Sequence, residues 1–262
     1  MIKDIRIRAF RATDDPETCD EFVKGHKKIL EDYGITQLSS SSDNWVNTNS
    51  TFVIAVKALN GKLLGGARIQ AANGIIPLPI EMATGSMDAR IFGKVKEKAI
   101  NGTGELCGVW NSKEASGLGI GSYFSIQAAM AICHQIGLES LFILCAPHTL
   151  KMFQQYGGSV ITDIGNKGTF YYPKIDLLTT AMFYHDLKTF NDGQVDKKEK
   201  LKSLIHNPIQ DKVEISPKNG VGINAMYNLL LKEVFRKEFK KKYDTDFSAL
   251  VTQTKIKTYY PI

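Results

Sequence analysis

Residues 120 to 137, IGSYFSIQAAMAICHQIG, are apolar nearly all round a helix. A helix of this kind has no face for solvent and must be buried between other elements. Candidate strands flank it, GTGELCGVW (102–110) before it and LESLFILCA (138–146) after it, and Pro147 ends the second. These residues therefore predict a core in which one buried helix lies against a sheet.

The remaining pattern alternates between strands and helices. We expect a strand at 5–10, a helix within 14–34 that closes at Gly34, and two strands that flank Asn60-Gly61, a strong hairpin signal. A short helix within 82–102, another at 148–158 and strands at 168–173 and 177–184 follow. The order predicts a mixed α/β sheet covered by helices. Beyond it we expect a polar tract (190–202), a turn-rich stretch around 207–220 and a basic amphipathic helix over 224–243.

Composition excludes several classes of protein. The chain has 262 residues and a net charge of +6, and it contains no apolar run that approaches a membrane span. Without a leader-like N-terminus we expect a cytoplasmic protein. The scattered cysteines and histidines predict no metal site. The basic segment KEVFRKEFKKK (232–242) could bind nucleic acid or an acidic partner, but a solvated helix face is its usual role, so we do not expect a nucleic-acid partner.

The polar stretch KEASGLGIGSYF (113–124) leads into the buried helix through Gly117, Gly119 and Gly121. Such a loop can hold a phosphate, because the start of a helix presents unpaired backbone N–H groups, or it can simply make a turn. The dinucleotide fingerprint does not fit, since Ser122 stands at its third glycine and the next strand ends without an acidic residue. A Walker A loop does not fit either, since Gly121-Ser122-Tyr123 lacks its Gly-Lys-Ser/Thr ending.

The order of strand, SGLGIG, buried helix, strand and short helix ending in Tyr156-Gly157 resembles the Gcn5-related N-acetyltransferase (GNAT) superfamily. The resemblance covers residues 5–185 and implies a mixed, largely antiparallel central sheet flanked by helices. It also implies a GNAT-like domain over 1–187 and a C-terminal extension over 188–262. Within the superfamily, the segments GGARIQ, PLPIE and GELCGVW most resemble the local sequence of N-acyl amino acid synthases and acyl-homoserine-lactone synthases. Those enzymes often take acyl groups from acyl carrier protein.

The resemblance implies that the loop binds the pyrophosphate of acetyl-CoA or a longer acyl-CoA. Gly119 and Gly121 occupy the two glycines of the family motif, while Ser116 stands where the family has Arg or Gln, with Lys113 nearby as a source of charge. The resemblance further implies that the backbone N–H of Val109 stabilises the oxyanion. The predicted donor-binding residues lie in one stretch and on the strand before it: Val109, Ser116, Gly117, Leu118, Gly119, Ile120, Gly121 and Ser122.

Attack of an amine on a thioester needs a base, an oxyanion donor and an acid for the leaving thiolate. Glu105 on the strand before the loop is the candidate base, although it could instead pair with a neighbour. Glu81 is a second carboxylate candidate and is predicted, with Arg68, to bind the substrate. Arg68 could lie under the substrate or bind its carboxylate, or serve as a paired structural residue. At the usual position of the acidic tyrosine the chain has Phe153, so Tyr156 remains as the candidate acid.

These features predict an N-acyltransferase that uses acyl-CoA or acyl carrier protein and a small-molecule amine acceptor. The alternative is a GNAT-fold module that binds an acyl-CoA without turning it over, which Phe153 and Ser116 favour and Glu105 opposes.

Overall fold

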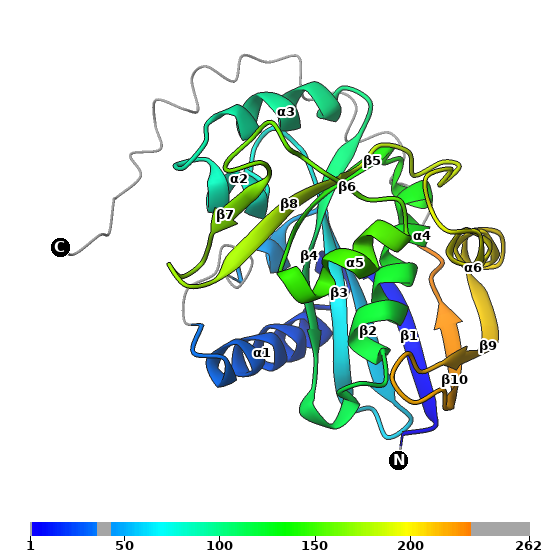
Figure 1. Cartoon of the computed structure of the whole chain (residues 1–262). Helices are drawn as coiled ribbons and strands as arrows, with labels where there is room; N and C mark the ends of the chain where they lie inside the picture. The colour runs from blue at the N-terminus through cyan, green and yellow to red at the C-terminus, as the bar shows by residue number, and fades with distance from the viewer. Residues whose placement is uncertain (1, 36–42, 232–262) are drawn as a thin grey trace.

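We describe a computed structural model of the chain, in which residues 2–35 and 43–231 are described. Within these residues, ten strands form one sheet in the order β6-β8-β5-β4-β3-β2-β1-β10-β9, with β7 beside β8 (Figure 1). The strands are β1 (Asp4–Arg11), β2 (Thr51–Ala58), β3 (Leu63–Ala71), β4 (Thr103–Asn111), β5 (Ser140–Cys145), β6 (Ser159–Val160), β7 (Thr169–Tyr171), β8 (Leu178–Tyr184), β9 (Ile209–Ile215) and β10 (Gly222–Asn228).

The sheet is mixed and largely antiparallel, as expected. Two pairs of adjacent strands are parallel, β4 with β5 and β1 with β10, and the other described pairs are antiparallel. The β4–β5 pair needs a long crossover, which the buried helix supplies.

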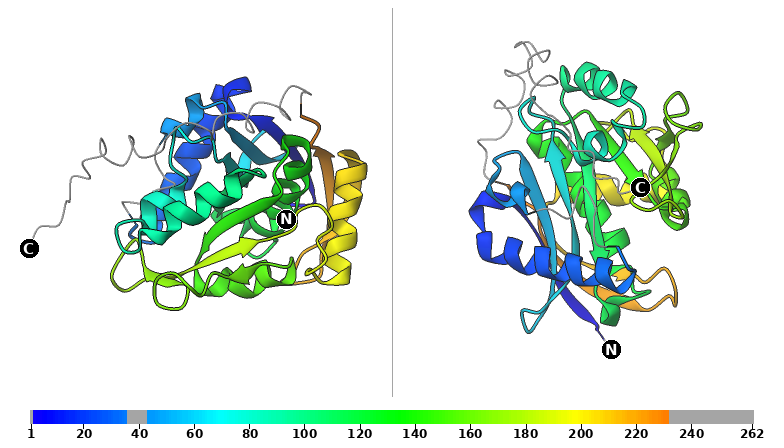
Figure 2. Two further views of the ribbon diagram at one scale, coloured as in Figure 1. Left: turned by 90° about the horizontal axis from the view of Figure 1, so that it is seen from above. Right: turned by 90° about the vertical axis from the view of Figure 1, so that its left-hand side faces the viewer.

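Helices cover both faces of the sheet. On one face lie α1 (Pro16–Asp32), α2 (Pro79–Thr84) and α3 (Arg90–Ala99), onto which the right-hand view of Figure 2 looks. On the other lie α4 (Ser125–Ile136), α5 (Pro147–Gln155) and α6 (Val195–His206). Strand side chains alternate between the faces, since Val53 packs with α1 and Ile54 packs with α4. The face of a residue on β3 or β4 therefore decides which helices it meets.

The predicted first helix and hairpin are confirmed. A capping residue explains where the helix starts, and a turn explains the hairpin. Asp15 Oδ1 accepts a 3.0 Å hydrogen bond from the Thr18 backbone N–H at the start of α1, with Pro16 at the first helical position. The turn at Asn60-Gly61 joins β2 to β3. The short helix expected within 82–102 is confirmed as α3, and the structure has a further helix, α2, which begins before that range at Pro79.

The C-terminal part of the fold differs from the prediction. The expected polar tract contains most of α6, and the turn-rich stretch contains β9. The basic helix predicted over 224–243 is wrong for residues 224–231. Residues 224–228 belong to β10, in which Ile223, Ala225 and Tyr227 are buried at alternate positions, and residues 229–231 are not helical. The remaining residues of the predicted helix, from 232 onward, lie outside the described part of the chain. β10 extends the sheet beside β1, and the boundary at 187/188 stays a prediction.

Candidate active site

β4 carries the centre of the site, because its pairing with β5 ends near its middle and its register with β3 is irregular just beyond that point. The described pairs with β5 run from Thr103–Ser140 to Glu105–Phe142, and β4 then continues to Asn111 beyond the end of that ladder. On its other side the register with β3 shifts between Gly66 and Arg68. The shift is a β-bulge that contains Val109, and bulges of this kind re-aim backbone groups near functional sites. The backbone around Val109 is thus outside the β4–β5 ladder.

Glu105 lies where β4 and β5 part. Its side chain is 2% exposed, and its Oε2 accepts a 2.6 Å hydrogen bond from the backbone N–H of Ile80 in α2. Burial raises the pKa of Glu105 to about 8, and the Glu81 carboxyl adds to the rise, whereas the Ile80 hydrogen bond and Arg68 oppose it. A carboxyl with this pKa can accept a proton near neutral pH, as a general base must.

Glu81 caps the helix that donates to Glu105. Its Oε2 accepts a 2.7 Å hydrogen bond from the backbone N–H of Leu78, the residue before α2. Burial raises the pKa of Glu81 to about 7, against this hydrogen bond. The carboxyl group therefore fixes the start of α2, and its predicted contact with substrate stays a prediction.

Arg68 lies on the same face of the sheet as Glu105. It pairs in register with Cys107, and Gln70, two residues further along β3, pairs with Glu105. The side chain is 1% exposed, and its guanidinium lies 4.7 Å from the centre of the Trp45 ring. The sequence brings a buried cation and a buried carboxylate to one side of β3 and β4.

Aromatic residues enclose Arg68 from the side of α1. The Phe22 ring makes edge contacts with Trp45 at 5.8 Å and with Trp110 at 5.7 Å between ring centres. His26, one turn further along α1, is buried, and burial and the Arg68 charge lower its pKa to about 4. Neutral His26 and the Trp45 ring thus lie close to Arg68 on the α1 side of the sheet.

The glycine loop begins where β4 ends. Asn111, the last residue of β4, accepts a 2.5 Å hydrogen bond on its Oδ1 from the backbone N–H of Gly121. A Cβ atom on Gly121 would lie 2.0 Å from the Trp110 carbonyl oxygen, so no larger residue fits there. A π-helical turn, η5 (Ile120–Phe124), follows and runs into α4, with a 3.0 Å hydrogen bond from the Phe124 N–H to the Gly119 carbonyl. The loop and the buried helix are thus docked on β4 as the sequence predicted.

Lys113 is paired with a carboxylate outside the loop. Its ammonium lies 3.0 Å from the Asp32 carboxylate at the end of α1, and its predicted role as a source of charge for the loop stays a prediction. Ser116, on the other side of the short helix η4 (Lys113–Ala115), carries no charge.

No family model matches the sequence, and no curated protein matches it. Among solved structures, FeeM, an N-acyl amino acid synthase from uncultured soil microbes, aligns with a TM-score of 0.54 and 14% identity over 74% of this chain and 97% of that one. The chain has the GNAT fold. A CoA-dependent acyl-homoserine lactone synthase, BjaI, aligns at TM-score 0.48 and 14% identity over 77% of this chain and 90% of that one. An acyl-CoA N-acyltransferase from Pseudomonas aeruginosa aligns at 0.47 and 13% over 68% and 98%.

In this GNAT fold Tyr156 is not brought to Glu105. Its side chain is 1% exposed in the core beneath α4, and its hydroxyl accepts a 2.7 Å hydrogen bond from Nε2 of Gln127. Burial raises the pKa of Tyr156 above its usual value. Glu105 points to the opposite face, toward α2. The role of Tyr156 as an acid stays a prediction, and the sequence could not show its commitment to Gln127.

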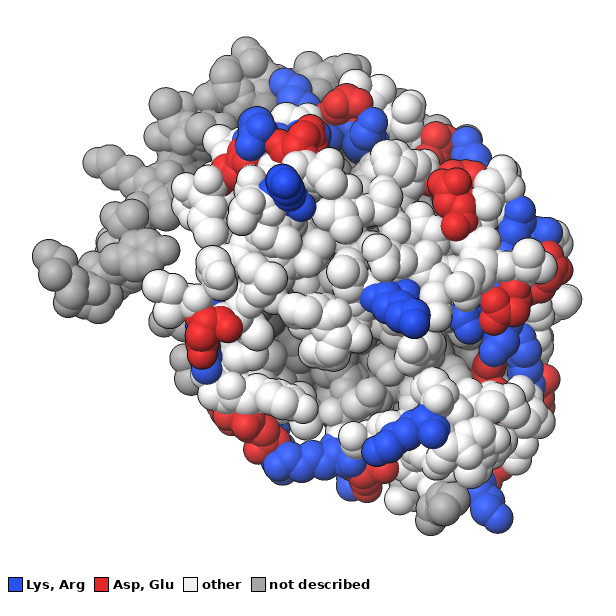
Figure 3. Space-filling view, in the orientation of Figure 1, with Lys and Arg blue, Asp and Glu red and all other residues white. Residues whose placement is uncertain are grey.

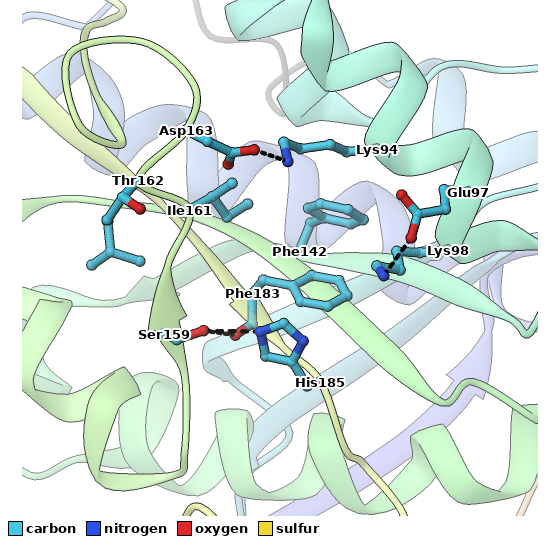
Figure 4. Close-up of a pocket in the computed structure, with 11 residues that line it drawn as sticks. Lys94, Glu97, Lys98, Phe142, Ser159, Ile161, Thr162, Asp163, Phe183 and His185 are labelled. Atoms are coloured by element: carbon cyan, nitrogen blue, oxygen red, sulfur yellow. Dashed lines mark hydrogen bonds and ion pairs between the residues drawn. The ribbon is translucent and has the colours of Figure 1, made fainter.

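A cavity of about 250 Å³ opens between α3 and the strands β6 and β8 (Figure 4). Phe142 and Phe183 lie in it, Lys94 is paired with Asp163, and His185 is 3.2 Å from the Ser159 hydroxyl. None of the predicted site residues lines this cavity. Phe142 is, however, the register partner of Glu105, so the cavity begins one strand away from the candidate base.

The face in Figure 3 is largely uncharged in its middle, and basic and acidic side chains lie side by side around its rim. No helix within the described ranges is long and apolar enough to cross a membrane. Among those same residues, no cluster of His, Cys, Asp and Glu has the three members that a metal site requires.

Sequence reasoning missed Asn111, whose amide oxygen orients the loop, and the backbone N–H of Ile80. A polar residue at the end of the strand before a glycine loop was the available signal for Asn111. The Ile80 contact joins segments 25 residues apart and carries no signal in the sequence.

Proposed function

We propose that the protein is an N-acyltransferase that moves an acyl group from acyl-CoA or acyl carrier protein to a small amine acceptor. The observation that carries this proposal is the position of Glu105, buried where β4 parts from β5, on the strand whose other end holds the glycine loop. This arrangement joins a base to a phosphate-binding loop on one strand. The GNAT fold supports the proposal, because FeeM, which shares this fold, is an N-acyl amino acid synthase.

The proposed reaction uses these groups in sequence. The acceptor nitrogen attacks the thioester carbonyl as a neutral amine and forms a C–N bond, and Glu105 takes the proton that this nitrogen loses. The backbone N–H of Val109 stabilises the oxyanion of the tetrahedral intermediate. The C–S bond then breaks, the acyl group stays on nitrogen, and the thiolate takes a proton from water or from the protonated Glu105.

The donor's phosphate would lie on backbone N–H groups of residues 117–122, with two exceptions: the Leu118 N–H donates to the Ala115 carbonyl, and the Gly121 N–H donates to Asn111 Oδ1. Arg68 is proposed to bind a carboxylate on the acceptor, since a guanidinium binds a carboxylate in two places and Arg68 shares the face of Glu105. Amino acids are therefore the proposed class of acceptor. Trp45 lies over Arg68, so entry of the acceptor requires Trp45 and η3 (Asn44–Asn47) to shift.

The experiment that tests the proposal follows transfer of a labelled acyl group. The protein is incubated with acetyl-CoA, long-chain acyl-CoAs or acylated acyl carrier protein, together with a panel of amino acids and amines. We expect saturable formation of an N-acyl product by the wild type and its loss in Glu105→Gln.

The second candidate is a non-catalytic GNAT-fold module that binds acyl-CoA. The commitment of the Tyr156 hydroxyl to Gln127 and the inert Phe153 favour it, because no tyrosine is then at hand for the thiolate. Binding of acyl-CoA without product formation with any acceptor, unchanged in Glu105→Gln, would establish this function instead.

A further inference from the structure

The turn between β9 and β10 lies on the glycine loop. Ser216 Oγ donates a 3.1 Å hydrogen bond to the carbonyl oxygen of Gly117. A Cβ atom on Gly117 would lie 2.7 Å from Cδ of Lys218, and one on Gly119 would lie 2.7 Å from Cδ of Pro217. Both glycines have φ near +80°, a conformation that side chains disfavour. A side chain at Gly117 or Gly119 would therefore be disfavoured both by the backbone conformation and by contact with the turn.

The sheet fixes this turn in place. β10 pairs with β1 from Asp4–Asn224 to Arg8–Asn228, so the hairpin is anchored on the edge of the sheet. Within the hairpin, the buried Glu214 carboxylate accepts a 3.0 Å hydrogen bond from the Tyr227 hydroxyl. The turn itself is closed by a 2.9 Å hydrogen bond from the Ser216 N–H to the Val221 carbonyl. Its position on the loop is thus set by a rigid element.

Lys218 differs from the other lysines close to this stretch. The ammonium of Lys113 lies 3.0 Å from Asp32, and that of Lys62 lies 2.8 Å from Glu114. Lys218 is exposed and makes no ion pair with any residue in ranges 2–35 and 43–231. Because its aliphatic stem lies along Gly117, its ammonium stays near the loop while remaining available to a ligand.

We propose that Lys218 binds the phosphate of the acyl donor at the glycine loop, and so supplies from the C-terminal hairpin the charge that Ser116 does not. This inference rests on the proposed function, in which the loop holds a phosphate. An ammonium beside backbone N–H groups forms a charge-assisted contact with a phosphate oxygen. The ligand class is a pantetheine arm that ends in phosphate, which both CoA and holo acyl carrier protein present.

The test compares Lys218→Met, which keeps the stem and loses the charge, with Lys198→Met. Lys198 is a matched control on α6, where its ammonium donates to Asn191 Oδ1. Binding to CoA, pantetheine, holo acyl carrier protein and apo acyl carrier protein is measured by calorimetry with each full-length variant. Pantetheine lacks the phosphate, and the apo protein lacks the whole arm.

We expect Lys218→Met to weaken binding of CoA by about 10-fold, with a shallower dependence of Kd on salt, and to leave pantetheine binding unchanged. Lys218→Arg should retain most of the affinity, and Lys198→Met all of it. If the wild type binds holo acyl carrier protein but not CoA, Lys218→Met should lose affinity for the holo protein by the same factor and should bind the apo protein as the wild type does.

Wild-type affinity for CoA in a folded Lys218→Met, with an unchanged melting temperature, overturns the inference while the proposed function stands. An equal loss of apo and holo carrier protein also overturns it, because Lys218 would then contact the carrier's protein surface. If the wild type binds neither CoA nor holo acyl carrier protein, the proposed function itself is wrong.

Discussion

The backbone N–H of Ile80 donates a 2.6 Å hydrogen bond to the carboxylate of Glu105, and this contact ties the start of α2 to the point where β4 and β5 part. The same helix start is capped by Glu81. A rigid α2 therefore holds the candidate base at a fixed angle on β4. The contact also opposes the effect of burial on the pKa of Glu105, which burial nevertheless raises to about 8.

Replacing Glu105 with glutamine tests the base. Because glutamine cannot accept the acceptor's proton, we expect acyl transfer to fall by about 10²- to 10⁴-fold. In the wild type the rate should rise with pH and level off above about 8, since Glu105 acts only when deprotonated. Initial rates across pH 6–10 check this. Glu97→Gln, an exposed change on α3, should keep the wild-type rate and profile; a similar loss there would point to a general effect of charge.

The same substitution should change how stability depends on pH. The folded state holds the Glu105 proton up to about pH 8, whereas the unfolded chain loses it near 4.5. The folded state thus binds more protons within that window, and the free energy of unfolding should fall as pH rises through it, by at most about 1.4 kcal/mol per unit. Urea unfolding of Glu105→Gln should show a shallower fall. Parallel curves for the two proteins would mean that Glu105 is solvated in the folded state.

Alanine at position 121 should damage the fold locally and the donor site with it. A Cβ atom there meets the Trp110 carbonyl at 2.0 Å, so the loop must move off β4, at a cost of roughly 1–3 kcal/mol. We expect a lower melting temperature and weaker binding of CoA. Gly93→Ala on α3 is the matched control, because its Cβ meets nothing within 4 Å and should stabilise the helix by about 0.5–1 kcal/mol. Equal effects at the two positions would refute the close docking of the loop.

Arg68 should decide which acceptors are used. If it binds a carboxylate, Arg68→Met should raise KM for amino acids by about 10-fold or more and leave KM for amines without a carboxylate nearly unchanged. Arg68→Lys should recover only part of the loss, because an ammonium cannot bind in two places. Circular dichroism shows whether each variant folds. A uniform loss of activity for all acceptors would assign Arg68 a structural role under Trp45.

The sequence predicted those elements whose signals are local. Asn60-Gly61 marks a hairpin by itself, and the run from Ile120 to Gly137 can only be a buried helix. The π-helical turn at its start was not predictable, because it arises where Gly121 meets the backbone of β4.

The missed elements depend on distant partners. α6 buries Leu201 and Leu204 against α4 and is otherwise polar, so it looked like a loop. β10 alternates buried and exposed residues, which was a usable signal, but the following run of lysines favoured a helix. Its pairing with β1 joins residues such as Asp4 and Asn224, and no local pattern encodes it. The ion pair of Lys113 with Asp32, which lies in α1, likewise depends on a distant partner that no local pattern encodes.

The parallel pairing of β1 with β10 also sets an order of events during synthesis. β1 can pair with β2 as soon as residue 58 has emerged, but its other edge has no strand until residues 222–228 follow. A ribosome-bound chain therefore carries an open sheet edge, which is a site for aggregation, for most of its translation. The β9–β10 turn covers the glycine loop at the same late moment, so the proposed donor site is complete only after β10 has paired with β1.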